Sequence, residues 1–113
     1  MELSGVYPIL ATPFDDDGNV DYCSLEILVD FISKSGVQGL TSFLKPSLKC
    51  INNHIAKIAQ STSLQIIVQY APNESGIILD SSFFIELNNQ WTNIRHIKVK
   101  SVPSGPLISQ ITQ

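Results

Sequence analysis

The chain has few cysteines and few basic residues, and both shortages exclude classes of site. Its two cysteines, Cys23 and Cys50, show no CxxC or CxxH spacing, which argues against a zinc site and a disulfide framework and favours reduced, buried thiols. The seven lysines and arginines are outnumbered by ten aspartates and glutamates, so the net charge is −3. This balance gives no basic surface for nucleic acid or an anionic membrane.

Long apolar runs are also missing. No run approaches the roughly 18 to 20 residues of a membrane span, and the N-terminus lacks the basic and apolar regions of a secretion signal. We therefore expect a cytoplasmic protein. With 113 residues, 43% of them hydrophobic and 15% charged, the chain is expected to form one packed globular domain.

One acidic segment imitates a calcium-binding loop. Asp15, Asp17, Asn19 and Glu26 fall at ligand positions of such a loop, but its sixth position, which needs glycine for a sharp turn, holds Val20. The segment therefore predicts a turn and no calcium site.

The two histidines also lack the surroundings of a metal site. His54 falls on the polar side of a predicted helix and His96 within a predicted strand, and neither has an acidic or cysteine partner at ligand spacing. Surface or packing roles are favoured for both. We expect no metal and no cofactor.

Strand-like and helix-like patterns alternate along the chain, which is typical of βα units that build a parallel sheet. Apolar, β-branched runs bounded by turn residues predict strands over residues 6–11, 37–43, 64–68 and 94–99. The run 64–68 is almost continuously apolar, as expected for a strand covered on both faces.

Helices are predicted between these strands. The first is capped by Asp21 and ends at Gly36; the second starts at Pro46-Ser47 and carries an apolar stripe of Leu48, Ile51, Ile55 and Ile58. The third is capped by Asp80 and runs to Trp91, and a short one covers residues 107–113. Residues 73–76 and 101–106 are predicted loops.

Several segments together resemble a known enzyme family. The segment Gly5-Val6-Tyr7-Pro8-Ile9-Leu10-Ala11-Thr12-Pro13-Phe14 with the residues up to Leu40, and the later stretch holding Phe43-Leu44-Lys45-Pro46-Ser47, Gln69-Tyr70-Ala71-Pro72-Asn73-Glu74-Ser75-Gly76 and Ile97-Lys98, are similar to the dihydrodipicolinate synthase and N-acetylneuraminate lyase family. Its members are pyruvate-dependent class I aldolases on a (β/α)8 barrel. The fold implied is α/β: an incomplete TIM barrel with about three βα units and a fourth parallel strand.

The resemblance also implies how the chain is divided. Residues 1–113 form a single partial barrel domain, in which 1–40 resembles the first βα unit with the start of strand two, and 43–113 resembles the middle of the barrel. The join falls near 40–43. A complete barrel needs about 250 residues, and the family's Gly-Thr-Thr-Gly-Glu motif and roughly three βα units are absent between the two stretches.

By the resemblance, the chemistry belongs to Lys98. The family's lysine on strand six attacks the ketone of pyruvate to form a Schiff base, and the derived enamine adds to an aldehyde or is released from one. Attack requires the neutral amine, which burial or a nearby like charge favours. Strand alternation predicts Ile94, His96, Lys98 and Lys100 on one face, so Lys100 is a candidate for that second charge. The alternative is that Lys98 and Lys100 are solvated charges on an edge strand.

Two further residues are expected at the substrate. Where the family has a proton-shuttling tyrosine this chain has Gln69, whose amide can hydrogen-bond a substrate but cannot act as general acid or base at neutral pH. Tyr70 follows and should point to the opposite face of the strand. Thr12 ends the first predicted strand and is expected near the mouth of the barrel.

Two classes of function remain open. The first is a carbon–carbon lyase or synthase that acts on pyruvate or a related 2-oxo acid with an aldehyde, impaired in so short a chain. The second is a non-catalytic fragment or partial barrel that acts only by assembly with another chain. Because an incomplete barrel exposes strand edges and an apolar face, we expect self-association, most simply a homo-oligomer.

Overall fold

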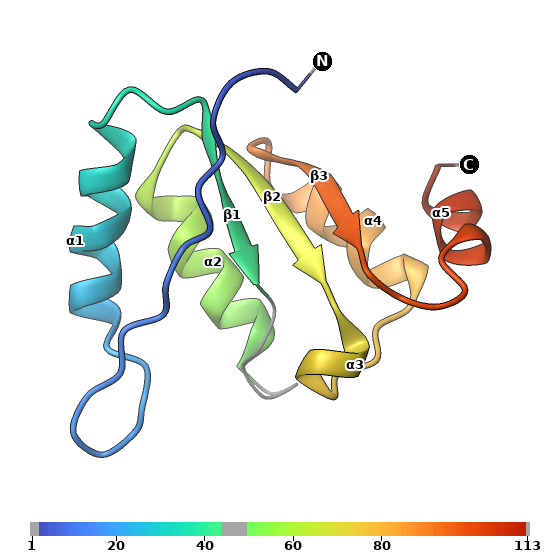
Figure 1. Cartoon of the computed structure of the whole chain (residues 1–113), viewed down its shortest axis with the longest axis horizontal. Helices are drawn as coiled ribbons and strands as arrows, with labels where there is room; N and C mark the ends of the chain where they lie inside the picture. Colours follow the sequence, from blue (N-terminus) through green and yellow to red (C-terminus); the bar gives the residue numbers. More distant parts are fainter. Residues whose placement is uncertain (1–2, 44–49, 113) are drawn as a thin grey trace.

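A computed structural model describes residues 3–43 and 50–112, which form an α/β fold with a three-stranded parallel sheet (Figure 1). The strands lie in the order β1-β2-β3; helices α1, α2 and α4 lie on one side of the sheet, and α5 lies beyond β3 at its edge. The elements are α1 (Tyr22–Ser33), β1 (Gly39–Phe43), α2 (Ile51–Ser61), β2 (Gln65–Tyr70), α3 (Pro72–Ser75), α4 (Ser81–Gln90), β3 (Ile94–Val99) and α5 (Gly105–Ile111). The predicted alternation of strands and helices is thus confirmed.

The first predicted strand, residues 6–11, is not a regular strand. The segment runs extended beside β1 and is joined to it by a single bridge, Ile9 to Thr41. Leu10 N–H donates to the Thr41 carbonyl at 2.8 Å, and Thr41 N–H donates to the Pro8 carbonyl at 2.8 Å. The ladder stops there because Pro8 has no N–H to donate. The segment still occupies the place of a fourth parallel strand at the β1 edge.

The two N-terminal helix caps were predicted correctly, whereas the end of the first helix was not. Asp21 caps α1 by accepting a hydrogen bond from Ser24 N–H at 3.1 Å, and Asp80 caps α4 by accepting one from Phe83 N–H at 3.2 Å. Helix α1 ends at Ser33 and not at Gly36, which lies beyond it in the left-handed region with φ 84°.

Two further predictions concern residues 73–76 and the start of the second helix. Residues 73–76, predicted as a loop, include most of the short helix α3, which Pro72 begins and which ends at Gly76 with φ 73°. The predicted start of the second helix at Pro46-Ser47 and its apolar Leu48 lie outside the described residues. The rest of that apolar stripe, from Ile51 to Ile58, is buried in α2 as predicted.

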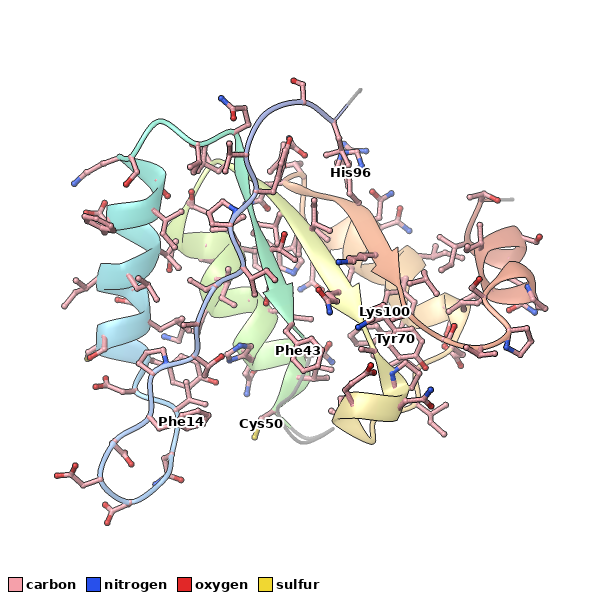
Figure 2. All side chains as sticks on the ribbon, viewed as in Figure 1. Phe14, Phe43, Cys50, Tyr70, His96 and Lys100 are labelled. Carbon is pink, nitrogen blue, oxygen red and sulfur yellow. The ribbon has the colours of Figure 1, made fainter. Side chains whose placement is uncertain are left out.

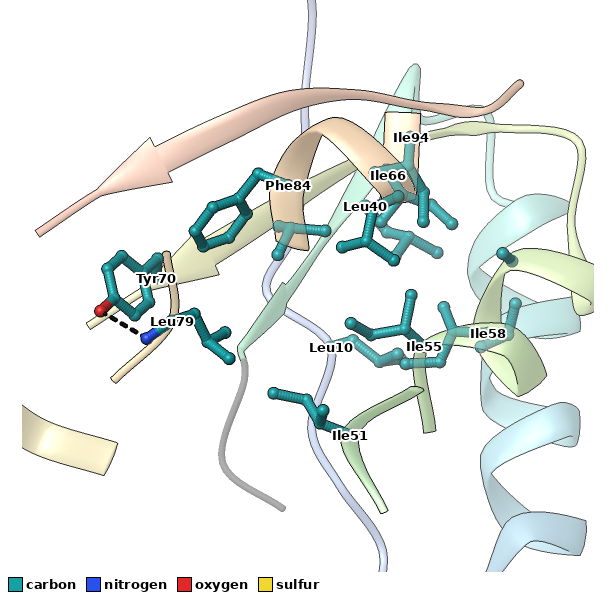
Figure 3. Packing of buried hydrophobic residues seen from close by; sticks show 14 of the residues in the cluster. Leu10, Leu40, Ile51, Ile55, Ile58, Ile66, Tyr70, Leu79, Phe84 and Ile94 are labelled. Carbon is teal, nitrogen blue, oxygen red and sulfur yellow. Dashed lines mark hydrogen bonds between the residues drawn. The ribbon is translucent and has the colours of Figure 1, made fainter. Parts of the chain in front are cut away.

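The hydrophobic core lies between the sheet and the helices (Figure 3). Alternate β2 residues Ile66, Val68 and Tyr70 face the helices and are buried there. Tyr70 packs its ring against Phe84 with centroids 5.1 Å apart, and its hydroxyl accepts a hydrogen bond from Leu79 N–H at 3.0 Å. The sheet's other face is therefore left to the remaining β2 residues.

Gly39 is fixed by close packing at the start of β1. A Cβ at this position would overlap the Gln65 carbonyl of β2 and the Tyr7 ring of the N-terminal segment. The glycine therefore lets the N-terminal segment and β2 lie on either side of β1 at normal spacing.

Three sequence expectations are corrected by burial. Cys23 and Cys50 are free thiols but exposed, because both lie on the solvent side of their segments. His54, expected on the polar side of its helix, is only 1% exposed because α1 packs over α2 and covers it. Within residues 3–43 and 50–112, no helix has the length and apolarity to cross a membrane.

Candidate functional site

The open face of the sheet contains a hollow of about 670 Å³. Its walls come from the N-terminal segment, all three strands and α5, and the side chains that line its sheet side include Ile9, Thr41, Ile67, Gln69, His96 and Lys98. Because α1, α2 and α4 pack on the other face, this hollow corresponds to the inner face of a barrel.

Lys98 and Gln69, the two residues expected to act on substrate, are direct neighbours across β2 and β3. The register pairs Gln69 with Lys98, and both side chains line the hollow. Lys98 is exposed. The burial expected to favour a neutral amine is therefore not supplied by the described residues alone.

The prediction that Ile94 and Lys100 share one face with His96 and Lys98 is wrong. Between Ile94 and His96 the strand contains a bulge, since Ile66 pairs with Ile94 while the next residue, Ile67, pairs with His96. The bulge places Ile94 in the core among the helices, whereas His96 and Lys98 line the hollow. Lys100 lies beyond β3, and its Nζ approaches Glu74 Oε1 at 3.4 Å. Its charge is thus directed to Glu74 of α3.

The side-chain amide oxygen of Gln69 is buried without a hydrogen-bond partner. Its side chain is 9% exposed, and its Oε1 has no hydrogen-bond partner. A buried amide oxygen without a partner is costly unless a ligand or water satisfies it. Tyr70, as predicted, points to the opposite face, where it is 4% exposed in the core.

Of the threonines Thr41 and Thr12, only Thr41 lines the hollow. Thr41 lines the hollow, but its hydroxyl donates to the Tyr7 carbonyl at 3.3 Å and so is already engaged as a donor. Thr12, predicted near the mouth, is half-buried and lies after the segment that bridges to β1. The residues that line the hollow do not include it.

Sequence reasoning assigned His96 only a surface or packing role. The structure places it on the same face as Lys98, two residues earlier on β3, with its Nε2 buried and unpartnered. Figure 2 shows His96 toward the start of β3 and Lys100 beyond its other end. The two-residue spacing from Lys98 was the signal in the sequence.

The charges around the hollow have one sign. Lys98 and Arg95 line it, and among the described residues no aspartate or glutamate does. Arg95 donates from Nε to the Thr92 carbonyl at 3.1 Å, which leaves its other guanidinium donors available. In a chain of net charge −3, this hollow suits an anionic ligand.

A second polar cluster lies between α1 and α2, away from the hollow. Tyr22 Oη lies 3.5 Å from His54 Nδ1, and the ring centroids are 5.9 Å apart. Burial raises the pKa of Tyr22, with a smaller contribution from the nearby Cys50, and burial lowers the pKa of His54. Both effects favour neutral side chains, as expected for packing groups. Across the described ranges, no three histidine, cysteine, aspartate or glutamate side chains are grouped to hold a metal ion.

Comparison with known proteins gives one match in sequence. The 4-hydroxy-tetrahydrodipicolinate synthase of Oceanobacillus iheyensis is 29% identical over 101 residues, which cover 86% of this chain and 32% of that enzyme. The chain thus spans about a third of the length of the relative it matches. No family model matches it.

Solved structures match as well, and one of them covers almost the whole chain. The dihydrodipicolinate synthase of Aquifex aeolicus superposes with a TM-score of 0.60 at 18% identity, covering 97% of this chain and 59% of that structure. A monomeric dihydrodipicolinate synthase variant gives a TM-score of 0.66 at 21% identity over 80% of this chain and 31% of that structure. These likenesses establish the fold as part of a TIM barrel. In sequence and in fold the chain is thus similar to members of the dihydrodipicolinate synthase and N-acetylneuraminate lyase family.

Proposed function

We propose that this chain carries the Schiff-base site of a carbon–carbon lyase or synthase, with Lys98 as the nucleophile and a 2-oxo acid such as pyruvate as the substrate. The neutral amine adds to the ketone carbon, the adduct takes up one proton and loses water, and an iminium forms. Loss of a proton from the neighbouring carbon gives an enamine, which adds to an aldehyde; the reverse sequence cleaves the same bond.

One observation carries this proposal: Lys98 faces Gln69 across two paired strands in a single hollow. An amine that must form an imine needs a ketone held beside it, and the unpartnered Gln69 amide can hydrogen-bond that ketone's substituents. The cationic lining supplies the charge that a 2-oxo acid would meet.

Two properties of the site residues lead us to expect weak activity. Lys98 is exposed, so the described residues do not enclose its amine away from water. Gln69 offers no proton transfer. We expect imine formation to be detectable by trapping and turnover with an aldehyde to be slow.

The test is reductive trapping. The folded chain is incubated with pyruvate and borohydride, and the modified peptide is identified by mass spectrometry. A stable adduct is expected on Lys98 and should be lost in Lys98→Arg, which keeps the charge but provides no reactive amine. Lys57→Arg, at an exposed position on α2, is the matched control and should keep the adduct. A folded protein without an adduct, or with adducts spread over several lysines, would refute the proposal.

A second candidate function is a non-catalytic partial barrel that works by assembly with another chain, most simply a second copy. The exposed apolar residues of the N-terminal segment favour it: Val6 is 60% exposed and Ile9 66% exposed at the sheet's edge. A protein that fails to trap pyruvate but associates through this face would have this second function.

A further inference from the structure

We propose that His96 is a specificity-determining residue of the Lys98 site, where its imidazole binds the carboxylate of the 2-oxo acid. The inference rests on the proposed function and extends it to the substrate group that the site recognises. Its starting point is His96, which lines the same hollow and whose Nε2 is buried without a hydrogen-bond partner.

The spacing along β3 suits this role. Residues two apart on a strand point to the same face and are separated by about 6.6 Å. His96 and Lys98 are such a pair, and both line the hollow. In an imine formed at Lys98 Nζ, the carboxylate carbon is bonded to the imine carbon, so the carboxylate stays close to Nζ, on the face of the sheet that His96 shares.

The other donors near Lys98 fit the carboxylate less well. The Thr41 hydroxyl already donates to the Tyr7 carbonyl at 3.3 Å. Gln69 is a weaker candidate, because its buried atom without a partner is the acceptor Oε1, which suits a hydroxyl or an N–H, and only its Nε2 could donate to a carboxylate. His96 can present an N–H from Nε2 in the appropriate tautomer or when protonated, and a hydrogen bond to a carboxylate is charge-assisted.

Electrostatics select an anion for this position. Arg95 and Lys98 line the same hollow, and no carboxylate among the described residues competes for His96 there. Gln65 provides an internal comparison. Its Oε1 is also buried and unpartnered, but the residue does not line the hollow, so it should not contribute to ligand binding.

The experiment compares two ketones that differ in the carboxylate. Pyruvate and hydroxyacetone are trapped with borohydride on the full chain, and initial rates of adduct formation on Lys98 are measured. Because a hydrogen bond to a charged group is worth more than a neutral one, His96→Leu should slow trapping of pyruvate about tenfold or more. It should leave hydroxyacetone unchanged within about twofold. His96→Gln, which keeps a donor, should recover part of the pyruvate rate, and Gln65→Leu should leave both rates as they are.

Loss of both rates in parallel, or of neither, in the His96 variants would overturn the proposal. If the wild-type chain traps neither ketone, the Schiff-base function fails, and a second measurement then decides for His96 alone. Oxamate, which cannot form the imine, is titrated into protein with labelled imidazole nitrogens while both histidines are observed. A shift at His96 with His54 unchanged supports the carboxylate site, even if His96→Leu does not fold. No shift at His96 refutes it.

Discussion

Unpartnered polar atoms concentrate on the inner face of the sheet. Among the described residues, the buried side-chain atoms without a partner belong to Gln65, Gln69, His96 and Ser101, and the first three lie on β2 and β3. A buried polar atom without a partner is costly, and folded proteins keep few of them. Two of these residues, Gln69 and His96, line the hollow with Lys98, which is the arrangement expected of a face that a ligand or another chain completes.

His54 is a buried polar side chain that lies away from the inner face of the sheet. It is 1% exposed between α1 and α2, and burial lowers its pKa, so the folded chain holds it neutral. In the unfolded chain the imidazole regains a pKa of about 6.5. Folding therefore excludes a proton that the unfolded chain binds in mild acid.

We expect His54 to make the protein less stable as the pH falls. Its contribution is fully present above about pH 6.5, the unfolded pKa, and is lost toward the lower folded pKa with a slope of at most about 1.4 kcal/mol per pH unit. Urea unfolding at pH 7.5, 6.5 and 5.5 measures it. Hydrogen bonds from Ser24 and Ser82 lower the pKa of Asp21 and Asp80, whose contributions fall away only below about pH 3.8, outside this window.

The control for this prediction is His54→Leu. Without the imidazole, the decrease in unfolding free energy between pH 7.5 and 5.5 should become smaller than in the wild-type chain. An equal decrease in both proteins would show that His54 is not responsible.

At the scale of elements, the contact between β2 and the segment before α4 depends on one hydroxyl. Tyr70 Oη accepts from the buried Leu79 N–H at 3.0 Å. Tyr70→Phe keeps the ring packed on Phe84 but leaves that N–H without an acceptor. We expect a loss of about 1–3 kcal/mol in the free energy of unfolding, measured with urea.

Tyr22→Phe is the matched control for this prediction. The hydroxyl removed there lies 3.5 Å from His54 Nδ1, at the limit of a hydrogen bond, and its loss should cost less. Equal losses in the two variants would contradict the role given to the Tyr70 hydroxyl.

Sequence patterns predicted elements whose signals are local. The caps Asp21 and Asp80 and the strands β2 and β3 could be predicted because a capping carboxylate and an apolar run act over a few neighbouring residues. The first strand was mispredicted because its pairing depends on β1, more than 30 residues away, and stops at Pro8.

The candidate site was predictable only in part for the same reason. Gln69 and Lys98 were found through the family resemblance, and their cross-strand pairing follows from the register. The bulge after Ile94, which separates that residue from His96, has no local sequence signal. Periodicity alone therefore grouped Ile94 with Lys98. It also grouped Lys100 with Lys98, although β3 ends at Val99, and it gave no reason to distinguish His96 from a packing residue.

On the scale of the whole molecule, the helices protect one face of the sheet and leave the other open (Figure 1). A closed barrel removes both the free strand edges and this exposed face. The described residues do neither, and a second copy that covered the open face would bury apolar residues of the N-terminal segment and enclose Lys98. We therefore expect self-association, if it occurs through this face, to be coupled to the proposed chemistry.

We expect the chain to associate reversibly through the open face. Its apparent size in size-exclusion chromatography should therefore decrease on dilution. Ile9→Asp should shift the protein toward monomer, because Ile9 is 66% exposed and lines the hollow, so association would bury the new charge. Ile78→Asp is the control: Ile78 is 82% exposed but does not line the hollow, and its substitution should not change the elution. A folded wild-type chain that elutes as a monomer at every concentration would contradict assembly, and Lys98 would then have to react in the open hollow of a single chain.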